Sequence, residues 1–404
     1  MGEETIILMR EELGAKTDID PFADPPEILR LRREVRALCM QFPDAYWRDL
    51  DQRRGYPEAF VQALTDAGWL AALIPTRYGG LGYGLREAAA ILQEINESGG
   101  YAGPAHAQMY VMGTLLRHGS EEQKERYLPQ IASGAVRLQA FAVTEPTAGT
   151  DTTRIETAAV RDGNDYVITG RKIFISRVQH SDLMVLLART SPRDDARPTA
   201  GLSLFLIDLR EAGEAIQLRP LRMLMNNETN EVTIDALRVS ADALIGAEGM
   251  GFRHVLDGWN AERILIAAEC VGDGRWFIER AAGHAKTREV FGRPIGANQG
   301  IQFPLAMAWA QLEAADLMAR RATARFDANL PCGAEANTAK LLASEASWGA
   351  ANAAVDTLGG HGFNAERDVE RKFRETRLYR VAPVSNNLVL SYLAQHVLGL
   401  PRSY

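Results

Sequence analysis

The feature that most constrains the fold of this chain is a block of short strand-like runs between two helical regions. Residues 139–246 combine apolar and β-branched runs with turn signals, whereas apolar residues before and after them recur every three to four positions. Short strands separated by turns favour an antiparallel sandwich or barrel. We therefore predict an α+β chain with a leader (1–25), an N-terminal helical domain (26–138), a middle antiparallel β-barrel or sandwich (139–246) and a C-terminal helical bundle (247–404).

Turn and capping residues define several elements within these regions. Asp162-Gly163 separates runs at 156–161 and 165–169, which is a strong hairpin signal. Ser120, followed by a Glu- and Gln-rich turn, indicates the start of a helix. The glycines of 78–84 lack the spacing and the βαβ setting of a dinucleotide-binding loop, so we interpret them as a loop between helices. Further strands are expected at 181–188, 202–208 and 231–239, and long helices at 252–286, 299–328 and 335–358.

Composition excludes several classes of function. The net charge is −7 and there is no long basic run, so no nucleic acid is expected as a partner. The three cysteines are far apart and predict neither a disulfide framework nor a zinc site, and the histidines form no metal-binding pattern. No apolar run approaches the ~20 residues that span a bilayer, and the first ten residues fit neither a signal nor a transit peptide. We expect a cytoplasmic protein that does not contact a membrane.

The segment Phe141–Asp151, FAVTEPTAGTD, carries the most specific motif. As a strand followed by a turn, it offers backbone groups and the hydroxyls of Thr144 and Thr150 to a flat polar ring, and Gly149 permits close approach. It resembles the T-E-P-x-A-G-S-D signature that lies against FAD in the acyl-CoA dehydrogenases. The resemblance covers residues 26–400 and implies that family's architecture, in which the C-terminal domain is a four-helix bundle.

Three further segments extend the resemblance to the whole cofactor. Gly170–Ser176 is similar to G-x-K-x-W-I-T, with Phe174 and Ser176 in place of Trp and Thr, and is followed by Arg177 and Val178 where Asn-Gly is usual. Residues 287–295 resemble the R-x-x-F-G-x-P-I segment that crosses a dimer interface, and 356–363 resemble Q-x-x-G-G-x-G-F. The FAD-binding residues that the resemblance implies are Phe141, Val143, Thr144, Thr150, Phe174, Ser176, Arg288 (pyrophosphate), Phe291, Gln299, Asp356 (in place of Gln), Gly359, Gly360, Ser385 and Asn387.

The family removes the α-proton of a thioester with a glutamate found at one of two positions. Counting from Gly359-Gly360 places Pro383 at the first, where proline also lacks the backbone N–H that the family directs at the thioester oxygen. The second is a Glu-Arg pair on the helix after the β domain, as in the isovaleryl-CoA and long-chain members. Glu262-Arg263 occupies it, and the apolar residues that follow favour a buried base over a surface carboxylate, with a pKa raised by burial.

The resemblance also implies substrate contacts. Asn260 and Arg263 match positions that hold the site and the pantetheine of CoA, and Thr150 and Pro383 are expected near the substrate. His106 falls near the floor of the acyl pocket, although a structural histidine with satisfied hydrogen bonds is the simpler interpretation.

The resemblance implies FAD-dependent oxidation of an acyl-CoA to its 2,3-enoyl form, with electrons passed to an electron-transfer flavoprotein by a homodimer or homotetramer. Two other classes stay open: a flavin oxidase or monooxygenase on this fold, and a catalytically degenerate FAD-binding subunit of a hetero-oligomer or a DNA-associated relative. Pro383 favours the degenerate class, whereas Glu262 and the acidic charge oppose it.

Overall fold

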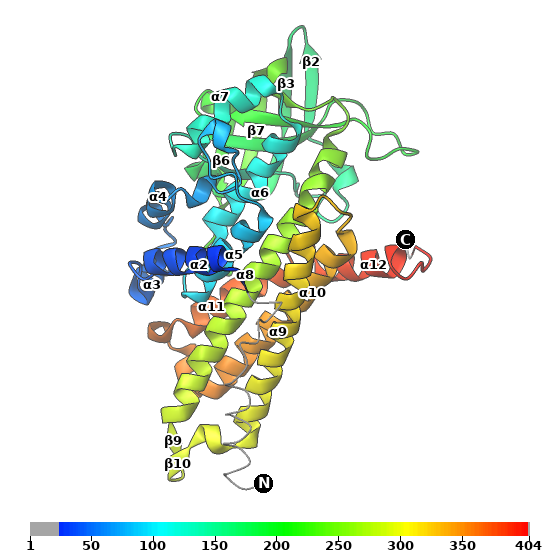
Figure 1. Ribbon diagram of the computed structural model, residues 1–404. Coiled ribbons are helices and arrows are strands. Elements are labelled where there is room, and N and C mark those ends of the chain that lie inside the picture. Colours follow the sequence, from blue (N-terminus) through cyan, green and yellow to red (C-terminus); the bar gives the residue numbers. More distant parts are fainter. Residues whose placement is uncertain (1–23, 403–404) are drawn as a thin grey trace.

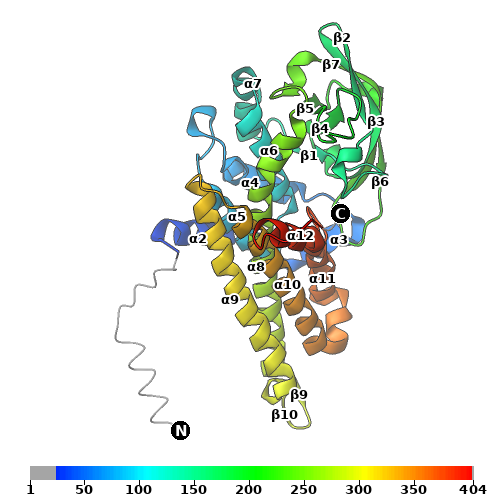
Figure 2. The ribbon, with the colours of Figure 1, turned by 90° about the vertical axis from the view of Figure 1, so that its right-hand side faces the viewer.

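The computed structural model describes residues 24–402, and most of the predicted leader, residues 1–23, lies outside them. Helices form the N-terminal part, a β-sheet follows, and long helices run away from the sheet (Figures 1 and 2). The predicted fold class is confirmed. Between residues 24 and 402, no helix is both long enough and apolar enough to cross a membrane.

The N-terminal helices pack through one apolar face each. In the first of them, Ile28, Leu31, Val35 and Cys39 recur every three to four residues and are all buried. Ser120 caps its helix as predicted, because its hydroxyl accepts a hydrogen bond from the backbone N–H of Gln123. The glycine-rich residues 78–84 form a loop between helices, as expected. The helices are α2 (Pro26–Cys39), α3 (Asp44–Arg53), α4 (Glu58–Asp66), α5 (Leu85–Glu97), α6 (Gly103–His118) and α7 (Glu121–Ala132).

The middle region forms one sheet with the strand order β6-β7-β3-β2-β4-β5-β8, and β1 pairs with β4. Most pairs are antiparallel, but β1 and β2 are both parallel to β4. The predicted hairpin is confirmed: Asp162 pairs with Asp165, and Gly163 adopts the positive φ of 64° that this turn requires. The strands are β1 (Leu138–Ala142), β2 (Ala158–Asp162), β3 (Asp165–Ser176), β4 (Leu183–Arg189), β5 (Leu202–Asp208), β6 (Ile216–Pro220), β7 (Thr229–Ser240) and β8 (Leu244–Ile245).

Strand β4 is buried on both faces, which explains its continuous apolar sequence. Leu183, Val185 and Leu187 pack in a core shared with α6 and α7, whereas Met184 and Leu186 face a second core formed by β3, β5 and β7. The sheet is thereby fixed against the N-terminal helices.

Three long helices dominate the C-terminal region and match the predicted positions. Alanines fill the contacts between them, so their backbones can approach closely. The first runs from the sheet to the far end of the bundle, where two short strands form a hairpin (Figure 1). The elements are α8 (Gly251–Thr287), β9 (Glu289–Val290), β10 (Arg293–Pro294), α9 (Gln299–Asp327), α10 (Gly333–Leu358), α11 (Val369–Thr376) and α12 (Asn386–His396).

A fully buried charge network joins α8 and α11 to the turn between α5 and α6. The Lys372 ammonium forms an ion pair with Asp273 of α8, lies 3.3 Å from Glu375 and donates to the carbonyl of Gly100 at 2.9 Å. Burial raises the pKa of Asp273 to about 7, and Lys372 opposes that rise. Removing one partner from such a network leaves an uncompensated charge in the interior.

We therefore predict that Lys372→Met lowers the free energy of unfolding by about 3–5 kcal/mol, the cost of breaking a buried pair. Chemical unfolding at a fixed protein concentration measures the effect. The double variant Lys372→Met, Asp273→Asn should recover part of the loss, and Arg53→Met, which removes an exposed ion pair with Asp49, should cost less than about 1 kcal/mol. Equal stability of the wild type and Lys372→Met would contradict the role of this network.

Candidate active site

Glu262 lies in the fourth turn of α8, and its side chain is buried, with 6% of the residue exposed. Its carboxylate makes no hydrogen bond or ion pair with any residue from 24 to 402, which is unusual for a buried acid. The prediction that this glutamate is buried is confirmed, and the side chain is free to act on another molecule.

The electrostatic surroundings of Glu262 suit a base near neutral pH. Burial raises the pKa of Glu262 to about 7, His106 and Arg263 lower it, and Glu269 raises it further. A carboxylate with this pKa is ionised for an appreciable fraction of the time at pH 7, yet binds a proton more strongly than an exposed one.

His106 belongs to a buried hydrogen-bonded chain below Glu262. Its Nδ1 lies 2.5 Å from the Glu269 Oε1, and the Tyr379 hydroxyl donates to the Glu269 Oε2 at 3.0 Å. Tyr379, from the turn Arg377–Arg380, in turn accepts from the Asn96 side chain at 3.0 Å. His106 is therefore held by its pairing with Glu269, and it also acts electrostatically on Glu262. Its interpretation as a structural histidine stays a prediction. Sequence reasoning missed Glu269, although it follows Glu262 by two helical turns on α8.

The two segments predicted to contact a flavin lie side by side. The N–H of Ile173 donates to the carbonyl of Thr144 at 2.9 Å, and the buried Lys172 ammonium donates to the carbonyl of Val143 at 3.0 Å and to Glu145 at 2.8 Å. Glu145 also accepts from the backbone N–H groups of residues 156 and 157. These bonds fix the strand end and the turn that follows it in one geometry.

The side chains of these segments differ in exposure. Phe141, Val143 and Thr144 are half-buried, Thr150 is exposed, and Phe174 is 55% exposed with a positive φ of 61°. Ser176 is half-buried, and its hydroxyl accepts from the Asn227 side chain at 2.8 Å. A large aromatic side chain with positive φ is an uncommon conformation that marks strained backbone.

Tyr110 of α6 links the flavin-type strand to Glu262. Its ring centroid lies 6.0 Å from that of Phe141 and 5.2 Å from that of His106. Burial raises the pKa of Tyr110, and the charge of Glu262 raises it further, which places the two groups within electrostatic reach. Phe141 and Val143 also pack against the core that contains Trp259 of α8. The structure thus brings Glu262, His106 and the strand together.

The loop that carries Pro383 is held against α10. The fully buried Lys340 ammonium of α10 donates to the Val384 carbonyl at 2.8 Å and to the Asn386 Oδ1 at 2.6 Å. Burial lowers the pKa of Lys340 to about 8, and the charge of Arg263 lowers it further, so the loop lies near the residue after Glu262. Pro383 itself is exposed.

Two predicted cofactor contacts follow this loop. Ser385 uses its hydroxyl as the N-cap of α12, where it accepts from the N–H of Leu388, and Asn387 is exposed. The neighbouring Asn386, which sequence reasoning did not select, is the buried asparagine that binds Lys340, Ser344 and Glu345.

Asn260 and Arg263 lie on one side of α8. The Arg263 guanidinium donates to the Asn260 Oδ1 at 3.4 Å and lies 5.7 Å from the centroid of the Trp259 ring. Burial lowers the pKa of Arg263, while Glu262 raises it. Both side chains are half-buried and adjoin Glu262.

The remaining predicted cofactor residues lie at the opposite end of α8 (Figure 1). Arg288 ends the helix, Phe291 is fully exposed, and both Gly359 and Gly360 are exposed just after α10. A cavity of about 440 Å³ lies between these helix ends, and its lining includes Arg280, Arg367 and Glu279 beside the imidazoles of His284 and His361. Gln299 and Asp356 are exposed in the same region. Within one chain, the two predicted halves of the FAD site are therefore far apart.

Comparisons with known proteins identify the three regions of the chain. Three family models match in order: acyl-CoA dehydrogenase N-terminal domain at residues 25–135, middle domain at 140–237 and C-terminal domain at 249–398. A Mycobacterium bovis protein named acyl-CoA dehydrogenase fadE12 is 34% identical over 386 residues, covering 95% of this chain and 99% of the relative.

Two further relatives have named thioester substrates. The cyclohex-1-ene-1-carbonyl-CoA dehydrogenase of Syntrophus aciditrophicus is 33% identical over 343 residues, which cover 84% of this chain and 82% of that protein. The structure of a glutaryl-coenzyme A dehydrogenase in complex with glutaryl-CoA has a TM-score of 0.88 at 29% identity, covering 95% of this chain and 98% of that one. By its three matched domains and its extended similarity to these relatives, the chain belongs to the acyl-CoA dehydrogenase family of oxidoreductases.

Proposed function

We propose that the protein oxidises an acyl-CoA thioester between its α and β carbons to the 2,3-enoyl-CoA, with FAD as its cofactor. The observation that carries the proposal is the Glu262 carboxylate, which is buried, bonded to no described residue and within electrostatic reach of Tyr110, whose ring packs near Phe141 of the flavin-type strand. This arrangement provides a base at the point where an α-proton would be removed.

The residues present fit FAD at both of its ends. The strand segments pinned by Lys172 and Glu145 present backbone groups beside the half-buried Ser176 and the exposed Phe174 ring. At the far end of the bundle, Arg288 and the glycines at 359 and 360 adjoin a cavity whose lining includes Arg280 and Arg367, which suits an anionic pyrophosphate. When bound, FAD supplies the acceptor for the hydride from the β carbon.

The chain's own residues perform the other tasks. Glu262 takes the α-proton, and its raised pKa lets it hold that proton after transfer. Arg263 and Asn260 hold the CoA end of the thioester beside it. Pro383 has no N–H to donate to the thioester oxygen, so that oxygen must be held by another donor.

The separation of the two cofactor half-sites supports an assembly of at least two copies. Arg288 and Phe291 of one copy would complete the site formed by the β-sheet of another, in a homodimer or homotetramer. We further propose an electron-transfer flavoprotein as the acceptor of the electrons. An unbonded, buried Glu262 favours this activity over a degenerate subunit, and slow reaction of the reduced flavin with oxygen would separate it from an oxidase or monooxygenase.

The variant Glu262→Gln tests the base. It keeps the side-chain volume but removes the proton acceptor, so the rate of flavin reduction by an acyl-CoA should fall by ~10²-fold or more. Anaerobic stopped-flow absorbance measures that rate, with FAD content and acyl-CoA binding retained. Glu125→Gln, which alters an exposed glutamate of α7 away from both predicted halves of the cofactor site, is the matched control. Reduction at the wild-type rate in Glu262→Gln would show that another group is the base.

The pH dependence tests the surroundings of the base. Because Glu262 must be ionised to accept a proton, kcat/KM should rise with pH through about 7 and then level off. His106 lowers the pKa of Glu262, so His106→Gln should move this limb to higher pH. His118→Gln, on the same helix but beside Asp257, should leave the limb in place. If the rise of kcat/KM with pH is the same in His106→Gln and the wild type, His106 does not lower the pKa of the base.

The variant Arg288→Ala tests the second half of the cofactor site. Loss of a charge-assisted contact to a pyrophosphate should lower FAD occupancy without unfolding the protein. The ratio of flavin to protein absorbance measures occupancy, and circular dichroism monitors the fold. Arg321→Ala, which removes an exposed arginine paired with Glu335, is the control. Full FAD occupancy in Arg288→Ala would contradict the assignment of Arg288 as a contact of the FAD pyrophosphate.

A further inference from the structure

Arg177 is a buried arginine for which the proposed reaction has no use. It directly follows Ser176 at the end of β3, adopts a positive φ of 58° and is 6% exposed. Its guanidinium donates one hydrogen bond, from Nη1 to the Asn227 Oδ1 at 2.5 Å, while the buried Nε has no partner. Because a guanidinium has five donors and stays charged, this environment leaves most of its bonding capacity unused.

The carboxyl group nearest to Arg177 is a weak partner. An Oε2 of Glu228 lies 3.9 Å from the Arg177 Nη1 and makes no hydrogen bond. Burial raises the pKa of Glu228 to about 7, although Arg177 opposes the rise. Near neutral pH this carboxyl group is therefore partly protonated, and the positive charge of Arg177 is incompletely balanced.

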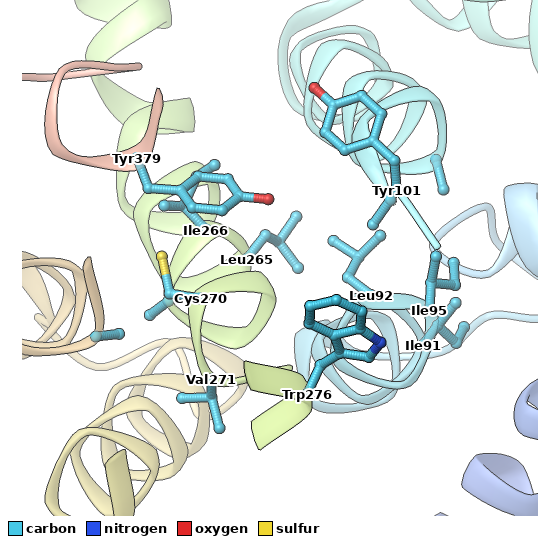
Figure 3. Close-up of a cluster of buried hydrophobic side chains, with 14 of the residues drawn as sticks. Ile91, Leu92, Ile95, Tyr101, Leu265, Ile266, Cys270, Val271, Trp276 and Tyr379 are labelled. Atoms are coloured by element: carbon cyan, nitrogen blue, oxygen red, sulfur yellow. The ribbon is translucent and has the colours of Figure 1, made fainter. Parts of the chain in front are cut away.

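A second donor converges on the same point. The Tyr101 hydroxyl donates to the Asn227 Oδ1 at 2.7 Å, so Arg177 and Tyr101 share a single amide oxygen. Figure 3 shows this hydroxyl pointing away from the aliphatic side chains of Leu92 and Ile95. The ring is closely confined, because a Cβ at Gly103 would lie 2.5 Å from its hydroxyl oxygen.

Tyr110 lies within electrostatic reach of both Arg177 and Glu262. Its pKa is raised by burial and by Glu262 and lowered by Arg177, so both charges act on the one phenol. Tyr101 stands two residues before α6, the helix that carries His106 and Tyr110, and it shares the Asn227 Oδ1 with Arg177. An acyl chain that runs from Glu262 along α6 toward the N-terminus of that helix would therefore end beside Arg177. His106, on the same face of α6, is already paired with Glu269 and adds no unbalanced charge.

We propose that Arg177 binds a carboxylate at the far end of the acyl group, beside the Tyr101 ring, so that the substrates are ω-carboxyacyl-CoA thioesters. The inference rests on the proposed dehydrogenase function. A carboxylate accepts two parallel bonds from a guanidinium and would occupy the donors that Asn227 leaves free. In the interior, such a charge-assisted pair discriminates strongly against a methyl group, which would leave Arg177 unpaired.

The test compares acyl-CoAs in pairs of equal chain length, one ending in a carboxylate and one in a methyl group. Anaerobic flavin reduction gives the rate and the apparent affinity for each. The wild type should prefer the carboxylated member by at least ~10-fold in kcat/KM. In Arg177→Met, kcat/KM for the carboxylated member should fall by ~10²-fold or more, and that for the methyl-ended member by much less.

Two further variants make the result specific. Arg177→Lys keeps the charge but loses the two parallel donors, so it should retain only part of the preference, more than Arg177→Met does. Arg219→Met, which alters an exposed arginine of β6 paired with Glu231, should match the wild type. FAD content and thermal midpoint verify that each variant is folded. If Arg177→Met does not fold, the wild-type preference and Arg177→Lys decide.

The outcomes separate the two proposals. Flavin reduction by methyl-ended substrates with no preference for a carboxylate overturns the role of Arg177 and leaves the dehydrogenase activity intact. A carboxylate preference that survives unchanged in Arg177→Met also overturns it. Reduction by no acyl-CoA of either kind overturns the dehydrogenase itself.

Discussion

The hydrogen-bonded chain from Asn96 through Tyr379 and Glu269 to His106 joins four separate segments at one buried point. It connects α5, the turn before the C-terminal loop, α8 and α6, each of which also contributes apolar side chains to the surrounding core (Figure 3). A buried polar network is stable only when its members satisfy one another. Because His106 lowers the pKa of Glu262 and Glu269 raises it, the residues that hold these helices together also influence the proton affinity of the base.

The long elements were predictable from sequence because their signals are local. The hairpin at Asp162-Gly163, the cap at Ser120 and the three alanine-rich helices follow from residues within a few positions of each other. The burial of Glu262 could also be predicted from sequence, because apolar residues follow it on the same helix. Each of these inferences needed only the period of an element or the chemistry of one turn.

Contacts between distant segments could not be derived in this way. Nothing near His106 identifies Glu269 as its partner, and nothing near Pro383 identifies Lys340 as the residue that holds the loop. The exposed Asn387 and the buried Asn386 are adjacent and chemically identical, so only the packing of α10 distinguishes them. The environment of Arg177 depends on residues 227 and 228, about fifty positions away, which no local pattern reveals.

The unbroken course of α8 has a consequence for stoichiometry. Glu262 and Arg288 are separated by ~39 Å along one rigid helix, at 1.5 Å per residue. Under the proposed assignment, a single subunit gives its base to one cofactor molecule and its arginine to another, so an isolated monomer would contain no complete site. Complete sites would form only in a closed assembly, in which each copy gives its Arg288 to a neighbour and receives an Arg288 from one. The number of complete sites would then depend on the symmetry of the assembly.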